Sequence, residues 1–360
     1  MSVQNKKLAI LQPQIPHYRE EFFIELRKKV ATDIFVVESP KEFIHKGFNL
    51  TTIPVKNLWN INIKGLLFYS PFPLLSSQYK TIVMMLHFAH ITTWLLLLTK
   101  KIHRKKIVLW GQGISVKRYL KEERKPDWKL KLMIALSDGV WLYMEKEEKM
   151  WKKVFPKKNI IALNNTLSGV SAICNYSSPQ NKDTIKKKYS ISQEIIFIFC
   201  ARFESNYRRT DLLIETIKQL NTQKFAFIII GEGKNKPNFS PYKNVYDFGA
   251  IYDSNIKQEL FSIADIYFQP GWVGLSIVEA MAYGKPIFTF KRSMETKQCV
   301  EYSYIINGKN GIIFNDLQHC LGYINDMSIK EIERMGNTAK NYVKQNLLPE
   351  YMVQRAISIL

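Results

Sequence analysis

Short apolar runs rich in β-branched residues alternate along the chain with segments whose apolar positions recur at helical spacing. This alternation is typical of parallel α/β sheets, in which a helix returns the chain after each strand. In the first half it predicts a clear helix over residues 18–29. The strands predicted for this half lie at residues 7–12, 33–38, 80–86, 106–110, 139–143 and 159–163.

A second α/β series follows a polar segment. Residues 166–192 are rich in Ser, Asn and Pro, which is typical of a connection between domains. We therefore predict two Rossmann-like parallel-sheet domains, over residues 1–165 and 193–345, facing a cleft at the carboxyl ends of their strands. A C-terminal helix over 346–360 is expected to pack back on the first domain. The strands predicted for the second domain are 194–200, 225–230, 244–248, 265–268 and 286–290.

The most apolar stretch, residues 81–99, approaches the length of a membrane span. Its middle carries His87, His90 and polar threonines, so we predict a strand, a loop and a helix there instead. The N-terminal residues have too short an apolar run for a signal peptide and are expected to form the first strand.

Composition indicates a globular protein, with 46% hydrophobic and 23% charged residues. The four cysteines lie far apart and without metal-binding spacing, so we expect reduced thiols and a cytoplasmic location. The formal net charge of +21 leaves nucleic acid, an anionic membrane surface and phosphorylated small molecules open as partners.

One basic segment, from Lys117 to Lys131, has seven basic residues against three acidic ones and runs into an apolar, Trp-containing stretch. This pattern suits an anionic membrane surface, and the inner face of the cytoplasmic membrane is the expected place of peripheral attachment. A solvated helix in a lysine-rich chain explains the same pattern equally well.

The densest chemical signal runs from Asp265 to Phe290: a strand, a Pro-Gly loop, a helix that starts near Gly274, and a second strand. The backbone amides of Gly274, Leu275 and Ser276 are predicted to face the cleft, where the positive end of the helix dipole suits a diphosphate. Glu279, one turn further on, can then reach ribose hydroxyls.

This segment resembles the retaining GT-B glycosyltransferases of glycosyltransferase family 4, whose signature helix reads G-L-x-x-x-E-A-M-A-x-G-x-P. In relatives a second glutamate usually lies eight residues before the one that Glu279 matches, and it contacts the donor sugar. This chain has Gly271 at that position. The residues that match the signature are Gly274, Leu275, Glu279, Ala280, Met281, Ala282, Gly284 and Pro286.

A second segment, Phe199 to Leu220, resembles the strand, arginine loop and helix of the same family. Arg202 falls on the family arginine and Arg208 on the family lysine, and the resemblance implies that both neutralise the donor diphosphate. Arg209 replaces a glycine. With Glu279, these two arginines are the predicted catalytic residues, and the structural alternative for the arginines is a solvated basic loop. The resemblance also implies that Gly249 and Ile251 contact the base, and the alternative for these two is an ordinary strand end and turn.

The first domain resembles the family less specifically. Residues 13–26 are similar to a segment beside the acceptor site, which implicates His17, Tyr18 and Arg19. His87 and Gln112 follow predicted strands and are also expected on the acceptor side. Metal binding by His87 and His90 is not expected, because no carboxylate or third ligand accompanies them.

The resemblance implies a metal-independent transferase without a cofactor that moves a sugar, with retention, from a UDP- or GDP-type donor to a glycan or lipid-linked acceptor. Bacterial cell-surface polysaccharide or lipopolysaccharide synthesis is the expected setting. No D-x-D motif follows a strand, which argues against a magnesium-dependent GT-A enzyme. Two alternatives stay open: an inactive sugar-nucleotide-binding or regulatory protein of the same fold, and a nucleic-acid binder, for which no reading motif is present.

Overall fold

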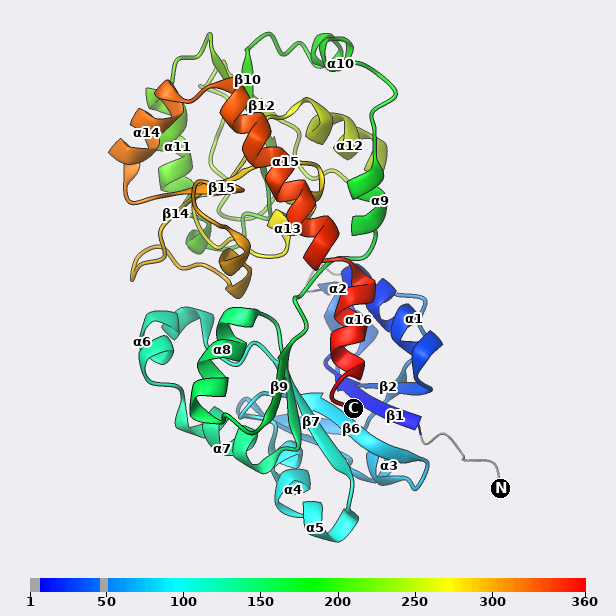
Figure 1. The fold of residues 1–360 in the computed structure, drawn as a ribbon. Helices are drawn as coiled ribbons and strands as arrows, with labels where there is room; N and C mark the ends of the chain where they lie inside the picture. The colour runs from blue at the N-terminus through cyan, green and yellow to red at the C-terminus, as the bar shows by residue number, and fades with distance from the viewer. Residues whose placement is uncertain (1–6, 46–50) are drawn as a thin grey trace. The chain divides into compact units, whose positions relative to one another are not determined.

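The computed structural model describes residues 7–45 and 51–360, and it divides into two compact units. The first unit is Met1–Gly169 together with Leu348–Leu360, and the second is Val170–Leu347. Each unit is built on its own parallel sheet (Figure 1).

The first unit has a seven-stranded sheet in the order β3-β2-β1-β6-β7-β8-β9, with all neighbours parallel. The order reverses direction between β1 and β6, which makes their carboxyl ends the switch point of this sheet. The strands are β1 Lys7–Gln12, β2 Thr32–Val36, β3 Lys56–Asn57, β6 Tyr79–Met85, β7 Lys106–Gly111, β8 Gly139–Leu142 and β9 Asn159–Ala162.

Helices cover both faces of this sheet, which explains why its strands are almost continuously apolar. The helices of the unit are α1 Glu20–Lys29, α2 Pro40–His45, α3 Phe72–Leu75, α4 Ile91–Leu98, α5 Lys100–His103, α6 Tyr119–Arg124, α7 Trp128–Leu136, α8 Glu145–Val154 and α16 Pro349–Ile357.

Alternate residues of β1 enter two separate cores, as the period of a strand requires. Leu8 and Ile10 pack with side chains of α1 and of α16, and Figure 1 shows these two helices side by side. Ala9 and Leu11 point into the opposite core, which α4, α7 and α8 close.

A two-stranded antiparallel hairpin, β4 Asn60–Ile63 and β5 Leu66–Tyr69, stands outside the sheet of the first unit. Its turn is Lys64-Gly65, and both residues have positive φ. The hairpin was not among the predicted strands, because its side chains are largely exposed and give no long apolar run.

The second unit has a six-stranded parallel sheet in the order β12-β11-β10-β13-β14-β15. Counted within the unit, this is the order 3-2-1-4-5-6 of a Rossmann sheet, with the switch point between β10 and β13. The strands are β10 Ile195–Cys200, β11 Phe225–Ile230, β12 Val245–Asp247, β13 Ile266–Phe268, β14 Ile287–Phe290 and β15 Gly311–Phe314.

Seven helices of the second unit surround this sheet. Leu213 and Ile217 of α11 share a core with Cys320 and Ile324 of α14, while α9, α13 and α15 pack on one another (Figure 1). The helices are α9 Val170–Asn175, α10 Lys182–Lys188, α11 Thr210–Gln219, α12 Ser254–Ile263, α13 Ser276–Ala282, α14 Leu317–Asp326 and α15 Ile329–Asn346.

The predicted fold class is confirmed, and every strand predicted from the sequence is present within one or two residues. The apolar stretch at 81–99 forms the end of β6, a loop and α4, as expected. No helix in the described ranges has both the length and the hydropathy needed to cross a bilayer. The segment expected as a connection, 166–192, carries α9 and α10.

Candidate functional site

The loops after β10 and β13 meet at the switch point of the second sheet. These strands are neighbours, paired through Phe197 with Ile266 and Ile198 with Tyr267. In an open parallel sheet this edge is where ligands bind, because the two adjacent loops diverge to opposite faces. The loop after β10 carries Arg202 and Arg208, and the loop after β13 leads into α13 and Glu279.

The loop after β13 is held by a buried glutamine that the sequence analysis did not single out. Gln269 is fully buried, and its amide nitrogen donates to the carbonyl oxygens of Gly271, at 3.0 Å, and Trp272, at 2.7 Å. Its amide oxygen accepts from the hydroxyls of Tyr267 and Ser276. One side chain therefore fixes both ends of the turn that leads into α13.

The helix after this turn begins at Ser276, two residues later than predicted, and Leu275 is its N-cap residue. Within the described residues, the backbone amides of Gly274, Leu275 and Ser276 donate to no protein acceptor. Three adjacent amides at the start of a helix are suited to the oxygens of an anionic ligand. The contact of these amides with a donor diphosphate stays a prediction.

Arg208 connects the two loops. Its Nε donates to the carbonyl oxygen of Arg202 at 3.2 Å, and its Nη1 donates to the carbonyl oxygen of Trp272 at 2.8 Å. Burial lowers the pKa of the Arg208 guanidinium, and the nearby charge of Arg202 acts in the same direction. Arginine still stays protonated at neutral pH, so a half-buried cation lies beside the loop that precedes α13. Arg202 itself is exposed.

Glu279 has a partner that the sequence analysis missed. Lys257 of α12 forms an ion pair with it, with Nζ 2.7 Å from Oε1 and 2.8 Å from Oε2. Both side chains are mostly buried, so the pair fixes the carboxylate on the first turn of α13. Nothing in the helical period of 254–263 distinguishes this lysine from a solvated one, so the sequence offered no signal for it.

Gly271 has no room for a side chain. An ideal Cβ there would lie 2.4 Å from the carbonyl oxygen of Tyr207 and 2.9 Å from Cγ of Arg209. Arg209 has φ +53, the left-handed conformation that favours the glycine of the related sequences. Its guanidinium pairs with Asp211, with Nη2 and Oδ2 2.7 Å apart. Gly271 and Arg209, the two residues that depart from the family pattern, therefore lie against each other.

The predicted base-contact residues follow the edge strand β12. Gly249 has φ +63, accepts a 2.7 Å hydrogen bond from the amide of Gly231, and would meet Glu232 if it carried a Cβ. Ile251 is half-buried in the next turn. Their contact with a base stays a prediction.

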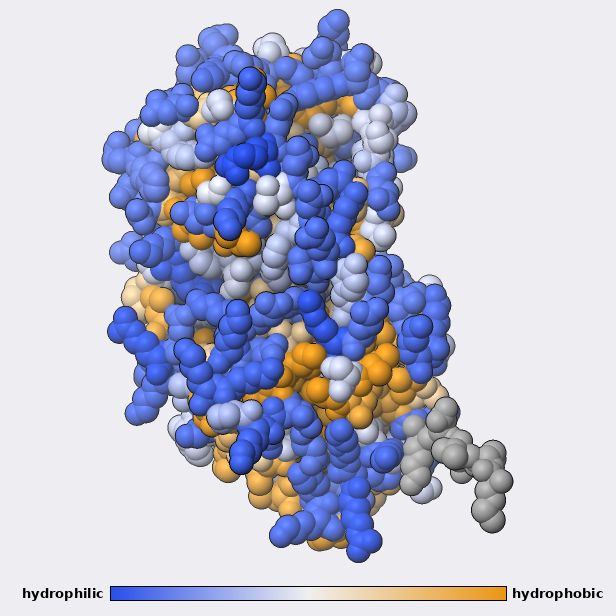
Figure 2. All heavy atoms as spheres, in the orientation of Figure 1, coloured by the Kyte–Doolittle hydropathy of each residue, from blue (hydrophilic) through white to orange (hydrophobic). Residues whose placement is uncertain are grey.

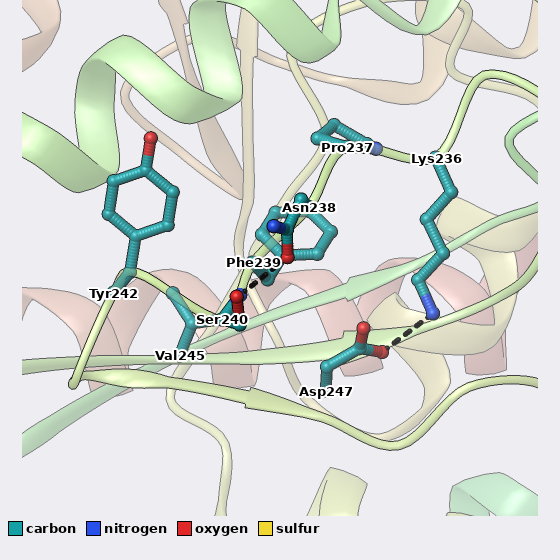
Figure 3. Close-up of a pocket in the computed structure, with 8 residues that line it drawn as sticks. All are labelled: Lys236, Pro237, Asn238, Phe239, Ser240, Tyr242, Val245 and Asp247. Carbon is teal, nitrogen blue, oxygen red and sulfur yellow. Dashed lines mark hydrogen bonds and ion pairs between the residues drawn. The ribbon is translucent and has the colours of Figure 1, made fainter.

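A pocket of about 480 Å³ lies beside the same edge strand and not at the switch point. Figure 3 shows Lys236 reaching Asp247 across it, with Nζ and Oδ1 2.8 Å apart, while Tyr242 points away from this pair. Its lysine is neutralised within the protein, so we do not assign the donor to this pocket.

The acceptor-side residues predicted in the first unit differ in exposure. Within the short turn after β1, His17 is exposed and Tyr18 is half-buried, but Arg19 is buried. The Arg19 guanidinium lies 5.1 Å from the ring of Trp110 and 5.3 Å from the ring of Tyr143, and it donates to Asn165 at 3.3 Å. Arg19 therefore contacts the interior of this unit, and the acceptor-side role of His17, Tyr18 and Arg19 stays a prediction.

His87 and His90 lie together after β6, with ring centroids 4.9 Å apart. Burial lowers the pKa of both, and that of His90 falls to about 4 with a further contribution from the charge of His87. The pair is therefore neutral at physiological pH. Gln112 follows β7 and is half-buried, and its role, like that of His87, stays a prediction.

No cluster of three or more His, Cys, Asp or Glu side chains suited to a metal occurs in the described part of the chain. All four cysteines are free thiols.

Comparisons with known proteins agree with this geometry. Residues 194–324, which contain the switch point of the second sheet, match the family described as "Glycosyl transferases group 1". No curated protein matches the sequence.

Solved structures match over the whole chain. The structure of Anabaena Alr3699/HepE in complex with UDP and glucose is 15% identical, with a TM-score of 0.63 over 98% of each chain. A glycosyltransferase from Rickettsia africae is 16% identical, with a TM-score of 0.65 over 99% of this chain and 98% of that one. The lipopolysaccharide outer core galactosyltransferase WaaB is 13% identical, with a TM-score of 0.64 over 98% of this chain and 100% of that one.

At these identities the structures establish the shared fold, and the sequence match of the second unit establishes the kind of enzyme. The chain is a glycosyltransferase with the two-domain GT-B fold, and its residues 194–324 match the family of group 1 glycosyl transferases.

Proposed function

We propose that this enzyme transfers a sugar with retention from a nucleotide-sugar donor to a glycan or lipid-linked acceptor. The observation that carries the proposal is the convergence, at the switch point of the second sheet, of three free backbone amides, a half-buried arginine and a carboxylate. The Anabaena protein is described with UDP and with UDP-glucose, which favours UDP over GDP as the donor nucleotide.

In this proposal the donor diphosphate lies against the amides of Gly274, Leu275 and Ser276, with Arg202 and Arg208 on its flank. Negative charge grows on the diphosphate as the glycosidic bond breaks, and fixed donors and cations stabilise it most in the transition state. Glu279 accepts hydrogen bonds from the ribose. The acceptor hydroxyl attacks from the face that the diphosphate leaves, and its proton passes to a leaving phosphate oxygen, so configuration is retained.

The same arrangement supports metal independence, because arginines and helix amides can stabilise the leaving diphosphate as a bound cation would. We expect turnover to survive exhaustive chelation. Loss of activity in EDTA, with recovery on adding magnesium or manganese, would overturn this part of the proposal.

The decisive experiment compares Arg202→Ala, Arg208→Ala and Glu279→Ala with the control Lys218→Ala, which alters an exposed ion pair on α11. Donor binding is measured by thermal shift over a panel of UDP- and GDP-sugars, and turnover by release of the nucleotide. The three site variants should lose binding and turnover while staying folded, as circular dichroism without donor would show. Product anomers read by NMR test retention, and an inverted product would refute it.

An inactive sugar-nucleotide-binding protein is the main alternative, and the side-chain-free Gly271 is the observation that favours it. Donor binding without hydrolysis or transfer, for every donor that binds, would support that alternative.

We further propose cell-surface polysaccharide or lipopolysaccharide synthesis at the cytoplasmic face of the membrane, with the basic segment Lys117–Lys131 toward an anionic surface.

A further inference from the structure

The first unit exposes large apolar side chains on three neighbouring helices. Leu98 of α4 is 67% exposed, Ile102 of α5 is 81% exposed and Trp128 of α7 is 68% exposed. Helix α4 contacts both α5 and α7, and Lys100 Nζ of α5 donates to the carbonyl oxygen of Leu136 of α7 at 2.9 Å. Figure 2 shows apolar atoms gathered over α4 and α5 beside hydrophilic ones. We call this surface the α4–α5–α7 face.

The charge of this part of the chain has one sign. Between Glu42 and Glu122 the sequence contains no Asp or Glu, although it contains twelve Lys and Arg. Helices α4 and α5 of the α4–α5–α7 face lie in this interval, and Lys100, Lys101 and Arg104 are the cations next to their exposed apolar residues. A surface that combines exposed apolar side chains with net positive charge is complementary to an anionic lipid bilayer.

The few carboxylates beside the face are already bound within the protein. Asp138 accepts from Lys100 at 2.9 Å and from the amide of Ile107 at 2.8 Å. Asp127 accepts from the first amides of α7, and Glu122 is buried and accepts from Arg118. Glu123 pairs with Lys146. These carboxylates therefore do not neutralise the basic side chains that have no acidic partner.

The predicted membrane segment, Lys117–Lys131, runs into α7 and adds further cations to the first unit. Lys121, Arg124, Lys125 and Lys131 take part in no ion pair among the residues that the structure describes. Lys129 lies with its Nζ 4.8 Å from the ring of Phe88 and 5.8 Å from the ring of Trp128. Such a lysine keeps its charge at the surface while its stem covers aromatic rings, as at a membrane interface.

A basic pocket of about 530 Å³ adjoins the apolar residues. It is lined by Lys100, Lys101, Arg104, Lys105 and Lys106, together with Asp138 and Asn159. Lys101 precedes the exposed Ile102 on α5, and Arg104 follows as the left-handed C-cap residue of the helix, so basic and apolar side chains lie close together in the chain. This spacing suits a lipid, whose phosphate headgroup and acyl chain are covalently joined.

We propose that the enzyme docks on anionic membranes through the α4–α5–α7 face, with Leu98, Ile102 and Trp128 entering the interface and a headgroup phosphate held by Lys101 and Arg104. This proposal deepens the proposed function, which brings the enzyme to a membrane, because it assigns the residues and the lipid chemistry of the contact. A nucleic acid would meet the cations but offers no partner for Leu98 and Ile102.

The test is co-sedimentation with vesicles of phosphatidylcholine alone and of phosphatidylcholine with one third phosphatidylglycerol. Wild-type protein should bind the anionic vesicles and not the neutral ones. Lys101→Glu/Arg104→Glu and Leu98→Ser/Ile102→Ser should each weaken binding at least tenfold. The matched controls lie in the second unit: Lys309→Glu/Lys330→Glu for charge and Met294→Ser/Ile329→Ser for apolar exposure, and both should bind like wild type.

Tryptophan emission gives a second readout. Vesicles should shift the emission of the wild-type protein to the blue, and the shift should shrink in Trp128→Phe. Variants of the α4–α5–α7 face that bind vesicles as tightly as wild type, or a wild type that binds neutral and anionic vesicles equally, would overturn the proposal. Wild-type binding to random duplex DNA, but not to vesicles, would also overturn it, in favour of a nucleic-acid surface.

The outcomes separate this proposal from the proposed function. Transfer to a short soluble acceptor analogue should be unchanged in the face variants, since none of these residues lies at the switch point of the second sheet. Vesicle binding by a protein that transfers no sugar would leave the docking face standing and remove the transferase mechanism.

Discussion

At the scale of single residues, Gly271 shows why a change at one position of the donor site requires a change at another. Its missing Cβ would overlap the carbonyl oxygen of Tyr207 and the side chain of Arg209, whose left-handed backbone already occupies the place of a glycine. Restoring the glutamate found in related sequences would therefore displace the loop that carries Arg208.

We predict that Gly271→Ala lowers turnover at least tenfold, because a 2.4 Å contact with backbone cannot be relieved by a rotamer change. The unfolding free energy should fall by about 1–3 kcal/mol. Gly322→Ala is the matched control: its Cβ would meet open space on α14, so stability should stay equal or rise by roughly 0.5–1 kcal/mol. Wild-type turnover in Gly271→Ala would show that the loop is free to move.

Lys257 permits a second test at this scale. In Lys257→Met the carboxylate of Glu279 loses its fixed partner, and we expect the KM for the donor to rise several-fold with kcat little changed. A double-mutant cycle with Glu279→Gln should give a coupling energy of about 1 kcal/mol in donor binding. If the losses of donor-binding free energy in the two single variants, measured by calorimetry, simply add in the double variant, Lys257 and Glu279 act independently.

At the scale of elements, the sequence predicted the strands well because helices cover both faces of each sheet. A strand such as β10 is buried almost throughout and so appears as a continuous apolar run. The β4–β5 hairpin escaped prediction because its residues are exposed. The signature around Gly274 and Glu279 pointed to the loop that the structure places at the switch point of the second sheet, and its role in donor binding stays a prediction. The contacts of Gln269, Lys257 and Trp272 depend on tertiary geometry, including the left-handed backbone of Trp272, which no local pattern encodes.

The junction of β6 and α4 adds a pH dependence. Burial lowers the pKa of His90 to about 4, and its Nδ1 has no partner in the described structure. The unfolded chain, with an ordinary histidine pKa near 6.5, then binds the proton more readily than the folded one. Stability should therefore be full above about pH 6.5 and fall as the pH drops from there towards 4.

We expect this histidine to account for a loss on the order of 3 kcal/mol over that interval. His90→Gln removes the titrating group, so denaturant unfolding of this variant between pH 4 and 7 should show a flatter dependence than that of wild type. Parallel curves for the two proteins would contradict the assignment.

At the scale of the whole molecule, the last helix belongs to the first unit. Met352, Val353 and Ala356 of α16 lie in the same core as Leu8 and Ile10 of β1. Deleting residues 348–360 should destabilise the first unit by on the order of 5 kcal/mol, comparable to the whole stability of many domains. Hydrogen exchange should then lose protection in β1 and α1 while β10 and β11 keep it. Unchanged protection in β1 would show that α16 is dispensable.

The position of α16 also has a consequence for how the protein is made. The ribosome releases nearly all of the first unit early, then the entire second unit, and only after it the helix that completes the first core. Until then the nascent chain exposes the apolar side of β1 and α1, which chaperones can bind. A message that ends early yields a finished second unit joined to an open first one, and that open core marks the truncated product for proteolysis.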